Sequence, residues 1–373
     1  MNEAVIEKVK TKKDLKNFIQ FPWKVYKNDP HWVPPLIMEM KEKLDKEKNP
    51  FFIHAEMGLY LAYKNNQIVG RIAAILDKDH NTYHHEKTGF FGLYESFNDL
   101  KTARKLMDTA AQWVKEKGMK SLRGPMNLSM NDECGFLLEG FDSSPVVMMP
   151  YNPPYYLDLM KKCGLSKIKD LYAFYMTRDH KTQKRVHALV KKIRRKSPVS
   201  LRRVDLKNIR EEARKIQYVY NQAWKDNWGF VPWRDEDMDH MAKNLKKLAD
   251  PDLVILAEAK GKTVGFAFGL PNYNEVLQKL NGRLFPLGIF KFLWYRRKIK
   301  GMRAVVFGVI DEYQNTGVSY LLYSELEKNG IAKGYQWGET SWQLEDNEAI
   351  NRFTESLGGR IYKKYRIYEK PIT

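Results

Sequence analysis

Apolar residues recur along the chain with two different spacings, and their alternation predicts a mixed α/β protein. Residues 305–310 are a run of mostly β-branched and apolar side chains, which is typical of a buried strand. A polar turn with one glycine follows, and then Leu321, Leu322 and Leu326 fall on one face of a helix that starts near Gly317. Because strands and helices of this kind alternate over almost the whole chain, we expect helices packed on a mixed sheet.

The chain also resembles itself at long range. Residues 61–70 and 256–265 both begin with Leu-Ala and end with Val-Gly, and Gly70 corresponds to Gly265 at an offset of 195 residues. Both segments are typical of a β-hairpin with a polar turn. A period of this length is too long for a solenoid and indicates a duplicated domain.

We therefore predict two copies of one domain. The first copy spans residues 1–178, a basic linker spans 179–200, and the second copy spans 201–373. The repeat register jumps and then recovers, which predicts an insertion in each copy, at 124–150 in the first and 272–301 in the second.

The linker and the second insertion each combine apolar and basic residues. In the linker, Val186, Leu189 and Val190 fall at helical spacing between basic faces, which predicts an amphipathic helix docked by its apolar stripe; contact with nucleic acid or anionic lipid is the alternative. The insertion holds a very apolar stretch, 284–295, that ends in a basic cluster. It would pack against the other domain, cap an acyl groove, touch a membrane surface or form a dimer contact.

The polar turn before Leu321 has the features of a phosphate site. A helix that begins at a strand–turn junction points backbone N–H groups and the positive end of its dipole outward, and such a terminus binds pyrophosphate well. Gly317 suits this role because a side chain would hold the phosphates away from the backbone. We predict that the cradle consists of Gln314, Asn315, Thr316, Gly317, Val318 and Ser319.

The order Gln314-x-x-Gly317-x-Ser319 after a strand resembles the acetyl-CoA signature of the GCN5-related N-acetyltransferase (GNAT) superfamily. A second resemblance lies downstream, where Asn347, Ala349, Phe353, Leu357 and Gly358 match the pattern of the helix and glycine turn that close the fold. One position departs from the family, because Thr354 stands where a tyrosine often protonates the leaving thiolate.

The resemblance implies two tandem acyl-CoA N-acyltransferase domains, each a mixed central sheet flanked by helices. It implies acetyl-CoA or another acyl-CoA as cosubstrate and no metal. It also implies that the backbone of Phe307, Gly308 and Val309 pairs with the pantetheine arm, and that Asn347 lies near the coenzyme.

Amide formation needs a base for the acceptor amine. The candidates are Glu339, which we expect to be half-buried on the strand before Asn347, and Glu312, at the mouth of the turn. A half-buried carboxylate at Glu339 would have a raised pKa, as a base requires.

The first copy lacks the glycine turn, and Glu95 and Asp99 stand near the position where phosphates would bind. We therefore predict one coenzyme per chain, in the second copy. The first copy also contains a polar loop, residues 127–141, whose composition suits a binding surface. With Thr354, its residues Asn127, Asn131 and Glu133 are our candidates for the acceptor site, in a cleft between the domains.

The composition indicates which partners and which compartment to expect. The chain has 64 basic and 45 acidic residues, a net charge of +19 that attracts polyanions, but we do not favour nucleic acid as a partner. The 2 cysteines and the absence of a signal peptide or an 18-residue apolar run predict a cytoplasmic protein that touches membranes at most peripherally.

The predicted function is transfer of an acetyl or longer acyl group from acyl-CoA to an amine. The acceptor is a small molecule or a peptide, and the sequence leaves open its identity, the acyl-chain length and the oligomeric state. Two alternatives are an aminoacyl-tRNA-dependent peptidyltransferase with two such domains, and an acyl-CoA sensor or scaffold without turnover.

Overall fold

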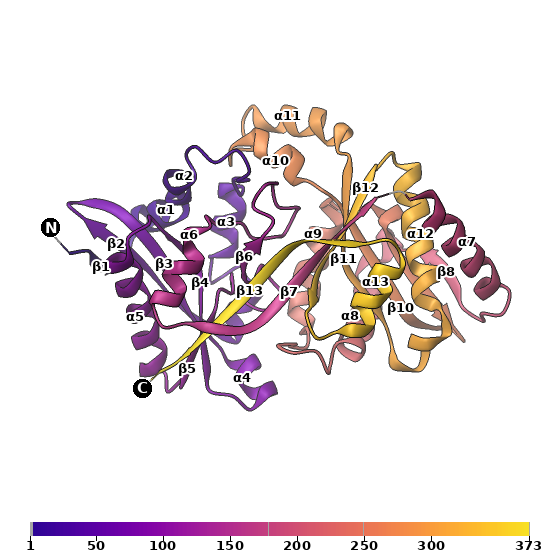
Figure 1. The fold of residues 1–373 in the computed structure, drawn as a ribbon, viewed down its shortest axis with the longest axis horizontal. Coiled ribbons are helices and arrows are strands. Elements are labelled where there is room, and N and C mark those ends of the chain that lie inside the picture. Colours follow the sequence, from indigo (N-terminus) through magenta and orange to yellow (C-terminus); the bar gives the residue numbers. More distant parts are fainter. Residues whose placement is uncertain (1–2, 178, 249, 373) are drawn as a thin grey trace. The chain divides into compact units, whose positions relative to one another are not determined.

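The computed structural model describes residues 3–177, 179–248 and 250–372, and the chain folds as two compact units (Figure 1). Unit 1 comprises Met1–Leu171, Val276–Leu293 and Lys363–Thr373, and unit 2 comprises Tyr172–Glu275 and Trp294–Tyr362. Residue 178, where the predicted first domain ends, lies outside the described residues. The units differ from the predicted ranges because most of the last strand, from Lys363 on, and part of the 272–301 insertion belong to unit 1, whereas residues 172–177 belong to unit 2.

Unit 1 is built on a mixed sheet with the strand order β1-β2-β3-β4-β5-β13. The pairs from β1 to β4 are antiparallel, β4 and β5 are parallel, and β13 is antiparallel to β5 and to β6. The strands are β1 (Val5–Lys8), β2 (Ala55–Lys64), β3 (Gln67–Asp77), β4 (Thr88–Ser96), β5 (Ser121–Gly124), β6 (Phe136–Glu139) and β13 (Arg360–Pro371).

The core of unit 1 lies where α5 packs on this sheet. The helix buries residues at three- and four-residue spacing, among them Ala103, Leu106 and Ala110, against Phe91 and Tyr156. The helices of the unit are α1 (Lys12–Gln20), α2 (Pro22–Val25), α3 (Ile37–Lys43), η1 (Pro50–Ile53), α4 (Lys78–His84), α5 (Leu100–Glu116), α6 (Tyr155–Lys162), α10 (Asn274–Leu280) and α11 (Gly288–Tyr295), of which α10 begins and α11 ends within unit 2.

Unit 2 repeats the same strand order, as the sequence repeat predicts. Its sheet runs β12-β11-β10-β9-β8, with β11 and β12 parallel and the other pairs antiparallel. The strands are β8 (Ser200–Arg203), β9 (Val254–Ala259), β10 (Lys262–Pro271), β11 (Gly301–Val309) and β12 (Trp337–Leu344); β7 (Ser166–Thr177), like β13, has residues in both units.

Two helices of unit 2 define the region of the predicted coenzyme turn. Helix α12 buries Val318, Leu322 and Leu326 against the sheet, and α7 packs beside α12 (Figure 1). The helices are α7 (His180–Arg194), η2 (Leu206–Asn208), α8 (Ile209–Ala223), α9 (Asp235–Leu248), η3 (Pro251–Leu253), η4 (Arg296–Lys298), η5 (Asp311–Thr316), α12 (Val318–Ala332) and α13 (Glu348–Ser356).

The basic linker is helix α7 of unit 2, and it docks by its apolar stripe. Val186 and Val190 are buried in a cluster with Leu321 and Leu357, while the basic residues of α7 are mostly exposed. The docking that we expected is therefore present through Val186 and Val190, whereas Leu189, the third residue of the predicted stripe, is 38% exposed.

Candidate acyl-CoA site

The predicted phosphate turn is a strand–turn–helix, as expected, but the reason for its glycine is different. Gly317 has φ +86°, in the left-handed region that favours glycine. A Cβ added there would lie 2.8 Å from Cδ1 and 2.9 Å from Cγ2 of Ile193 on α7. The glycine is therefore required by the backbone turn and by the packing of α7, whether or not a phosphate binds.

The helix that follows the turn keeps its first donors open. Tyr320 and Leu321 donate their N–H groups to the carbonyl of Gly317, at 3.0 and 3.3 Å. No side chain caps α12, and within the described residues the N–H groups of Val318 and Ser319 have no acceptor. The start of α12 therefore offers an anion the two donors that a helix N-terminus leaves unused.

The side chains of the turn fold back on the turn itself. Gln314 donates to Asp311 at 2.9 Å, and Thr316 donates to the carbonyl of Tyr313 at 2.7 Å. Lys225 pairs with Asp311 at 2.7 Å, so the negative charge of this carboxylate is offset, while Glu312 beside it is exposed. A ligand at this exposed turn would therefore meet backbone groups rather than the Gln314 side chain.

Strands β11 and β12 stop pairing before β11 reaches this turn, and we call the gap between them the split. The two strands pair only over Gly301–Ala304 with Trp337–Thr340. A β-bulge at Val305, where the register with β10 shifts, follows the last pair directly. Because bulges bend a strand and increase its twist, β11 turns away from β12 at this point. Backbone groups of Val305–Val309 that face away from β10 are left to pair with an extended ligand, the predicted role of Phe307, Gly308 and Val309.

An aromatic cluster lies beside the split. Phe307 of β11 stacks on Phe353 of α13 with ring centroids 5.8 Å apart, and Tyr320 of α12 meets Phe353 edge-on at 5.0 Å. All three side chains are only partly buried, so this part of unit 2 presents an apolar surface near the open edge of β11.

The predicted base Glu339 is buried more deeply than we expected. Its side chain has no exposed surface, whereas we predicted half-burial. Its Oε2 accepts a hydrogen bond from Ser341 at 2.8 Å and lies 3.6 Å from Nε of Arg303, its register partner on β11. Arg303 carries no signal for this role in the sequence, because only the strand pairing brings it beside Glu339. Glu312, the other candidate, is exposed on η5.

Asn347 and Thr354 have local structural roles. Asn347 caps α13, where its side chain accepts from the N–H of Ile350 at 3.3 Å. Thr354 is buried, donates to the carbonyl of Ile350 and accepts from Gln343 at 2.9 Å. Thr354 is therefore enclosed by residues of its own unit, and its part in an acceptor site stays a prediction.

Unit 1 has the corresponding split, but its own chain fills it. Strands β4 and β5 pair only over Thr88–Phe90 with Ser121–Arg123. Beyond that point the N–H of Met126 donates to the carbonyl of Phe91, and the N–H of Leu93 donates to Oδ1 of Asn127, both at 2.8 Å. The edge of β4 thus bonds the loop of unit 1 where the edge of β11 stays open.

This loop holds the predicted acceptor residues of the first copy. Asn127 also donates to Glu133 at 3.1 Å, which fastens the loop to itself, and Asn131 is exposed. Asn127 and Glu133 therefore have structural partners within unit 1, which the polar composition of the loop could not reveal.

The helix start that corresponds to α12 is closed in unit 1. Asp99 caps α5 by accepting from the N–H of Lys101 at 3.1 Å and the hydroxyl of Thr102 at 2.8 Å. The Glu95 side chain is only 12% exposed, and its burial raises its pKa, although Arg71 and the hydroxyls of Tyr156 and Tyr26 oppose the shift. A carboxylate therefore occupies the helix terminus that an anion would need.

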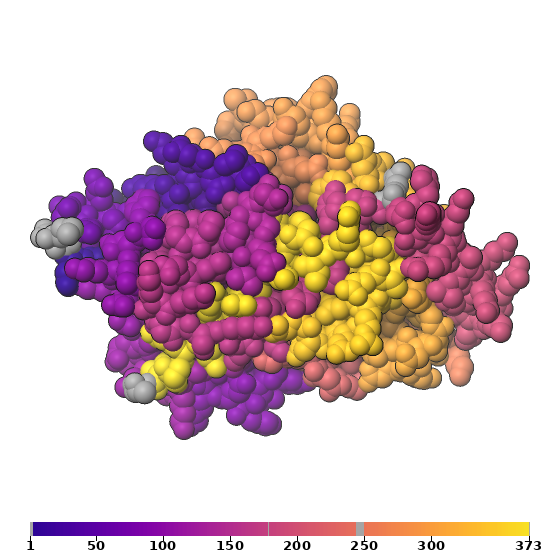
Figure 2. Space-filling model, in the orientation of Figure 1, coloured from indigo at the N-terminus to yellow at the C-terminus, as the bar shows by residue number. Residues whose placement is uncertain are grey.

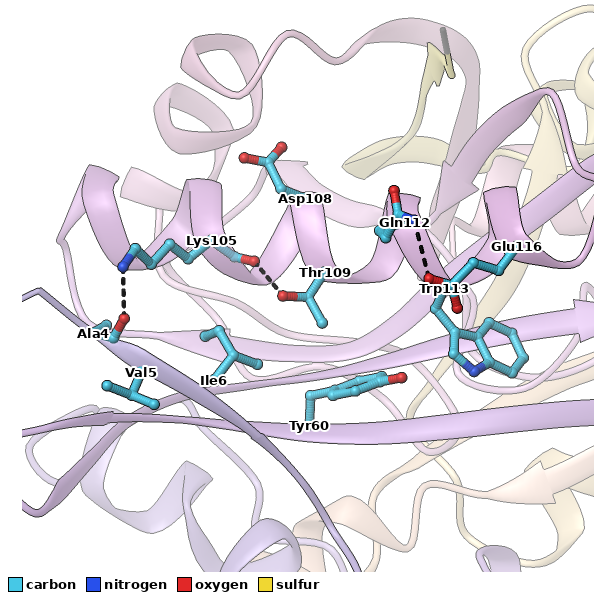
Figure 3. A pocket seen from close by; sticks show the side chains of 10 residues that line it. All are labelled: Ala4, Val5, Ile6, Tyr60, Lys105, Asp108, Thr109, Gln112, Trp113 and Glu116. Carbon is cyan, nitrogen blue, oxygen red and sulfur yellow. Dashed lines mark hydrogen bonds between the residues drawn. The ribbon is translucent and has the colours of Figure 1, made fainter.

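A cavity of about 640 Å³ lies elsewhere on unit 1, between β1, β2 and α5 (Figure 3). None of the predicted site residues lines it. Lys105 closes one end by donating to the carbonyl of Ala4, and Gln112 donates to Glu116 at the other. We assign no role to this cavity.

Within the described residues, no group of three or more potential metal ligands is present, and no helix is long and apolar enough to cross a membrane. In this same part of the chain Cys134 and Cys163 form no disulfide, and burial raises the pKa of the Cys163 thiol to about 11.

Two proteins match nearly the whole chain in sequence. Protein YghO of Escherichia coli (strain K12) is 36% identical over 378 residues, which cover 99% of this chain and 96% of YghO. The bacterial ceramide synthase of Caulobacter vibrioides (strain NA1000 / CB15N) is 35% identical over 374 residues, which cover 98% and 96% of the two chains. No family model matches the chain.

Solved structures identify the fold. A tandem GNAT protein from the clavulanic acid biosynthesis pathway matches with a TM-score of 0.60 and 11% identity, covering 100% of this chain and 99% of the other. A GCN5-related N-acetyltransferase from Sphaerobacter thermophilus matches with a TM-score of 0.54 and 11% identity, covering 100% and 96%. The predicted mixed α/β fold of the tandem GNAT type is therefore confirmed.

Proposed function

The chain belongs to the family that contains protein YghO and the bacterial ceramide synthase, within the GNAT superfamily, and we propose that it transfers an acyl group from acyl-CoA to an amine. One observation carries the proposal. In unit 2 an open strand edge, Val305–Val309, leads to an uncapped helix start at Val318, and an acyl-CoA presents an extended amide-bearing arm and a pyrophosphate to such a pair of features.

The name of one relative narrows the proposed substrates. Ceramide is a long-chain amino alcohol with a fatty acyl group on its nitrogen, so a ceramide synthase joins two long apolar chains through an amide. We propose that this chain likewise takes a long acyl group, and that the acceptor is the primary amine of an amphiphilic amino alcohol. The partly exposed rings of Phe307, Phe353 and Tyr320 offer an apolar surface suited to such chains.

The reaction forms one bond and breaks one. The neutral amine nitrogen attacks the thioester carbonyl, the C–N bond forms, the C–S bond breaks, and the thiolate leaves and takes up a proton. A backbone N–H on the open edge of β11, among Phe307, Gly308 and Val309, would donate to the developing oxyanion. Holding the thioester along a fixed strand also supplies orientation, which is a large part of the catalytic effect.

The two proposed bases lie at opposite ends of the open part of β11. Glu312 follows Ile310 at the phosphate end. The split begins at Ala304, six residues before Ile310, which is about 20 Å at the rise of a strand. Glu339 lies beside the split, where the thioester would reach, but its carboxylate is enclosed. We propose that Ser341, which donates to Glu339 at 2.8 Å, relays the amine proton to that carboxylate.

Three variants test this relay. Ser341→Ala should lower kcat at least 10-fold with little change in acyl-CoA affinity, while Glu312→Gln should leave kcat within about twofold of the parent. Glu339→Gln should also lower kcat, but it leaves Arg303 without its carboxylate, so Ser341→Ala is the cleaner variant. Full activity of Ser341→Ala would remove the relay and leave Glu312 or water as the base.

We further propose one coenzyme per chain, bound by unit 2. In unit 1 the loop at Met126 and Asn127 already bonds the edge of β4, and Asp99 already caps α5. A second coenzyme would have to displace both. Titration calorimetry with palmitoyl-CoA should therefore give a single site per chain.

The decisive experiment combines binding and turnover. The purified chain is incubated with acetyl-CoA or palmitoyl-CoA and with sphinganine, ethanolamine or a short peptide, and thiol release and amide mass are measured. We expect palmitoyl-CoA with sphinganine to react fastest. Binding of acyl-CoA without turnover on any amine would favour the sensor, and failure of both acyl-CoAs to bind or raise the melting temperature would favour the aminoacyl-tRNA alternative.

A further inference from the structure

The segment 285–300, which we call the α11 segment, exposes large apolar side chains. Leu287, Phe290 and Trp294 are 71%, 70% and 62% exposed, and Phe285 and Leu293 are exposed as well. Figure 2 shows the surface of this part of the chain in orange. Single exposed apolar residues are ordinary, but five within ten residues form a patch of the kind that marks a binding surface.

The exposed residues of α11 lie on one face. Phe290 and Trp294 are four residues apart and form a stripe, Leu293 lies beside it, and Leu287, three residues before Phe290, directly precedes the helix. Other helices of the chain, such as α5, bury the stripe that this spacing creates. No residue of α11 is buried, so the pattern that normally builds a core is here turned to the outside.

Positive charge borders the stripe. Lys291 lies within α11, and the basic residues Arg296, Arg297, Lys298 and Lys300 follow it. No acidic residue occurs between Glu275 and Asp311, and in the part of the chain that the structure describes these five cations make no ion pair with a carboxylate. Lys298 lies 5.1 Å from the ring of Trp294, so cation and aromatic ring meet at the edge of the patch.

The connection to α10 is held firmly in unit 1. Asn281 accepts from the indole N–H of Trp23 at 2.8 Å, Gln278 donates to the carbonyl of Pro30 at 2.7 Å, and the carbonyl of Gly282 accepts from Ile37 at 3.0 Å. Gly282 has φ +76°, and a Cβ there would meet the Trp23 ring at 2.4 Å. The apolar stripe therefore begins shortly after a segment, residues 278–282, that is fixed to unit 1.

We propose that the α11 segment docks the protein on the surface of a lipid bilayer that contains anionic headgroups. An interfacial helix places apolar and aromatic side chains at the acyl boundary and basic side chains among the headgroups, and anionic lipid adds electrostatic attraction. A symmetric contact with a second copy is less favourable, because it would bring two clusters of five cations together on chains that each carry +19. This docking does not depend on the proposed reaction.

Vesicle co-sedimentation of the full chain tests the proposal. The vesicles are phosphatidylcholine alone and phosphatidylcholine mixed with phosphatidylglycerol. We expect binding to the mixed vesicles, and Phe290→Ser/Trp294→Ser and Arg296→Gln/Arg297→Gln/Lys298→Gln should each weaken it at least about 10-fold. Because these residues are exposed, melting temperatures should change little.

Matched controls make the result specific. Ile53→Ser/Tyr218→Ser removes two exposed apolar residues from other elements, and Lys184→Gln/Lys191→Gln/Lys192→Gln removes three charges from α7. Both should bind as the parent does. Binding that is absent, or unaffected by the α11 variants, or equally reduced by the α7 variant, would overturn the proposal. So would gel filtration showing that the parent is a dimer and Phe290→Ser/Trp294→Ser a monomer.

Discussion

Replacing Gly317 separates what the phosphate turn does for folding from what it does for binding. A non-glycine residue at φ +86° costs about 1–2 kcal/mol, because its Cβ approaches the backbone. At Gly317 the new Cβ would also lie 2.8–3.1 Å from three atoms of Ile193, so either α7 shifts or the contact adds strain. We therefore expect Gly317→Ala to destabilise unit 2 by about 2–3 kcal/mol without any coenzyme present.

Gly334 provides the matched control. It has φ +90° in the same unit, and nothing lies within 4 Å of an added Cβ. Gly334→Ala should lose only the conformational term of about 1–2 kcal/mol. The difference between the two variants in urea unfolding then measures the packing of α7 on the turn, and Ile193→Ala in the Gly317→Ala background should recover part of it.

Coenzyme binding is the second readout. Gly317→Asp adds a negative charge at the open start of α12, so it should weaken acyl-CoA binding at least 10-fold, which is about 1.4 kcal/mol, while Gly334→Ala should not change it. Calorimetry under conditions where both variants remain folded gives the comparison. If Gly317→Asp binds acyl-CoA as tightly as the parent, the turn is not the phosphate site, and its glycine serves α7 alone.

Three further predictions concern single side chains. Thr354→Tyr should unfold at lower denaturant, because Thr354 is buried and packs so closely on Gly359 that a Cβ added to that glycine would lie 2.7 Å from Cγ2 of Thr354; a folded variant with raised kcat would show that tyrosine reaches the coenzyme. Asn127→Ala should cost about 1–3 kcal/mol of stability by leaving the N–H of Leu93 without its acceptor, with acyl-CoA affinity unchanged; a raised acceptor KM at normal stability would instead restore its acceptor role. The hydrogen bond from His80 and the charge of Arg123 hold the pKa of Glu86 at about 2, below its usual 4.5, so its contribution to stability is present above pH 4.5 and is lost as the pH falls towards 2. Urea unfolding at several pH values should therefore show a shallower acid loss for Glu86→Gln, and identical profiles would contradict this.

The parts of the site that the sequence predicts well are local. The strand before the turn, Gly317 and the helix after it lie within about thirty residues, and each has a compositional signal, so β11, η5 and α12 appear where expected. The linker helix α7 is predictable for the same reason, since its apolar stripe repeats at helical spacing.

The parts that the sequence does not predict depend on pairing between distant residues. Arg303 and Glu339 meet only because β11 and β12 share a register, and Ile193 meets Gly317 only because α7 packs on α12. A polar loop has the same composition whether it binds a ligand or its own strand, so Asn127 looked like an acceptor residue when it bonds Leu93. Likewise, the repeat could not show that residues 364–371 pair with β5 and β6 of unit 1.

The two splits together predict where hydrogen exchange should respond to the coenzyme. In unit 1 the amide of Leu93 already donates to Asn127, so it should exchange slowly with or without ligand. In unit 2 the amides of Val305–Val309 that face away from β10 have no strand beside them, so they should exchange quickly until a ligand pairs with them. At a ligand concentration 100 times Kd, binding stabilises the bound form by about 2.7 kcal/mol, which slows exchange through opening of the site about 100-fold. Slowing confined to β11 and the start of α12 would match one coenzyme in unit 2. Equal slowing at Leu93 would mean that the unit 1 loop gives way to a second coenzyme, and that filling the split does not prevent binding.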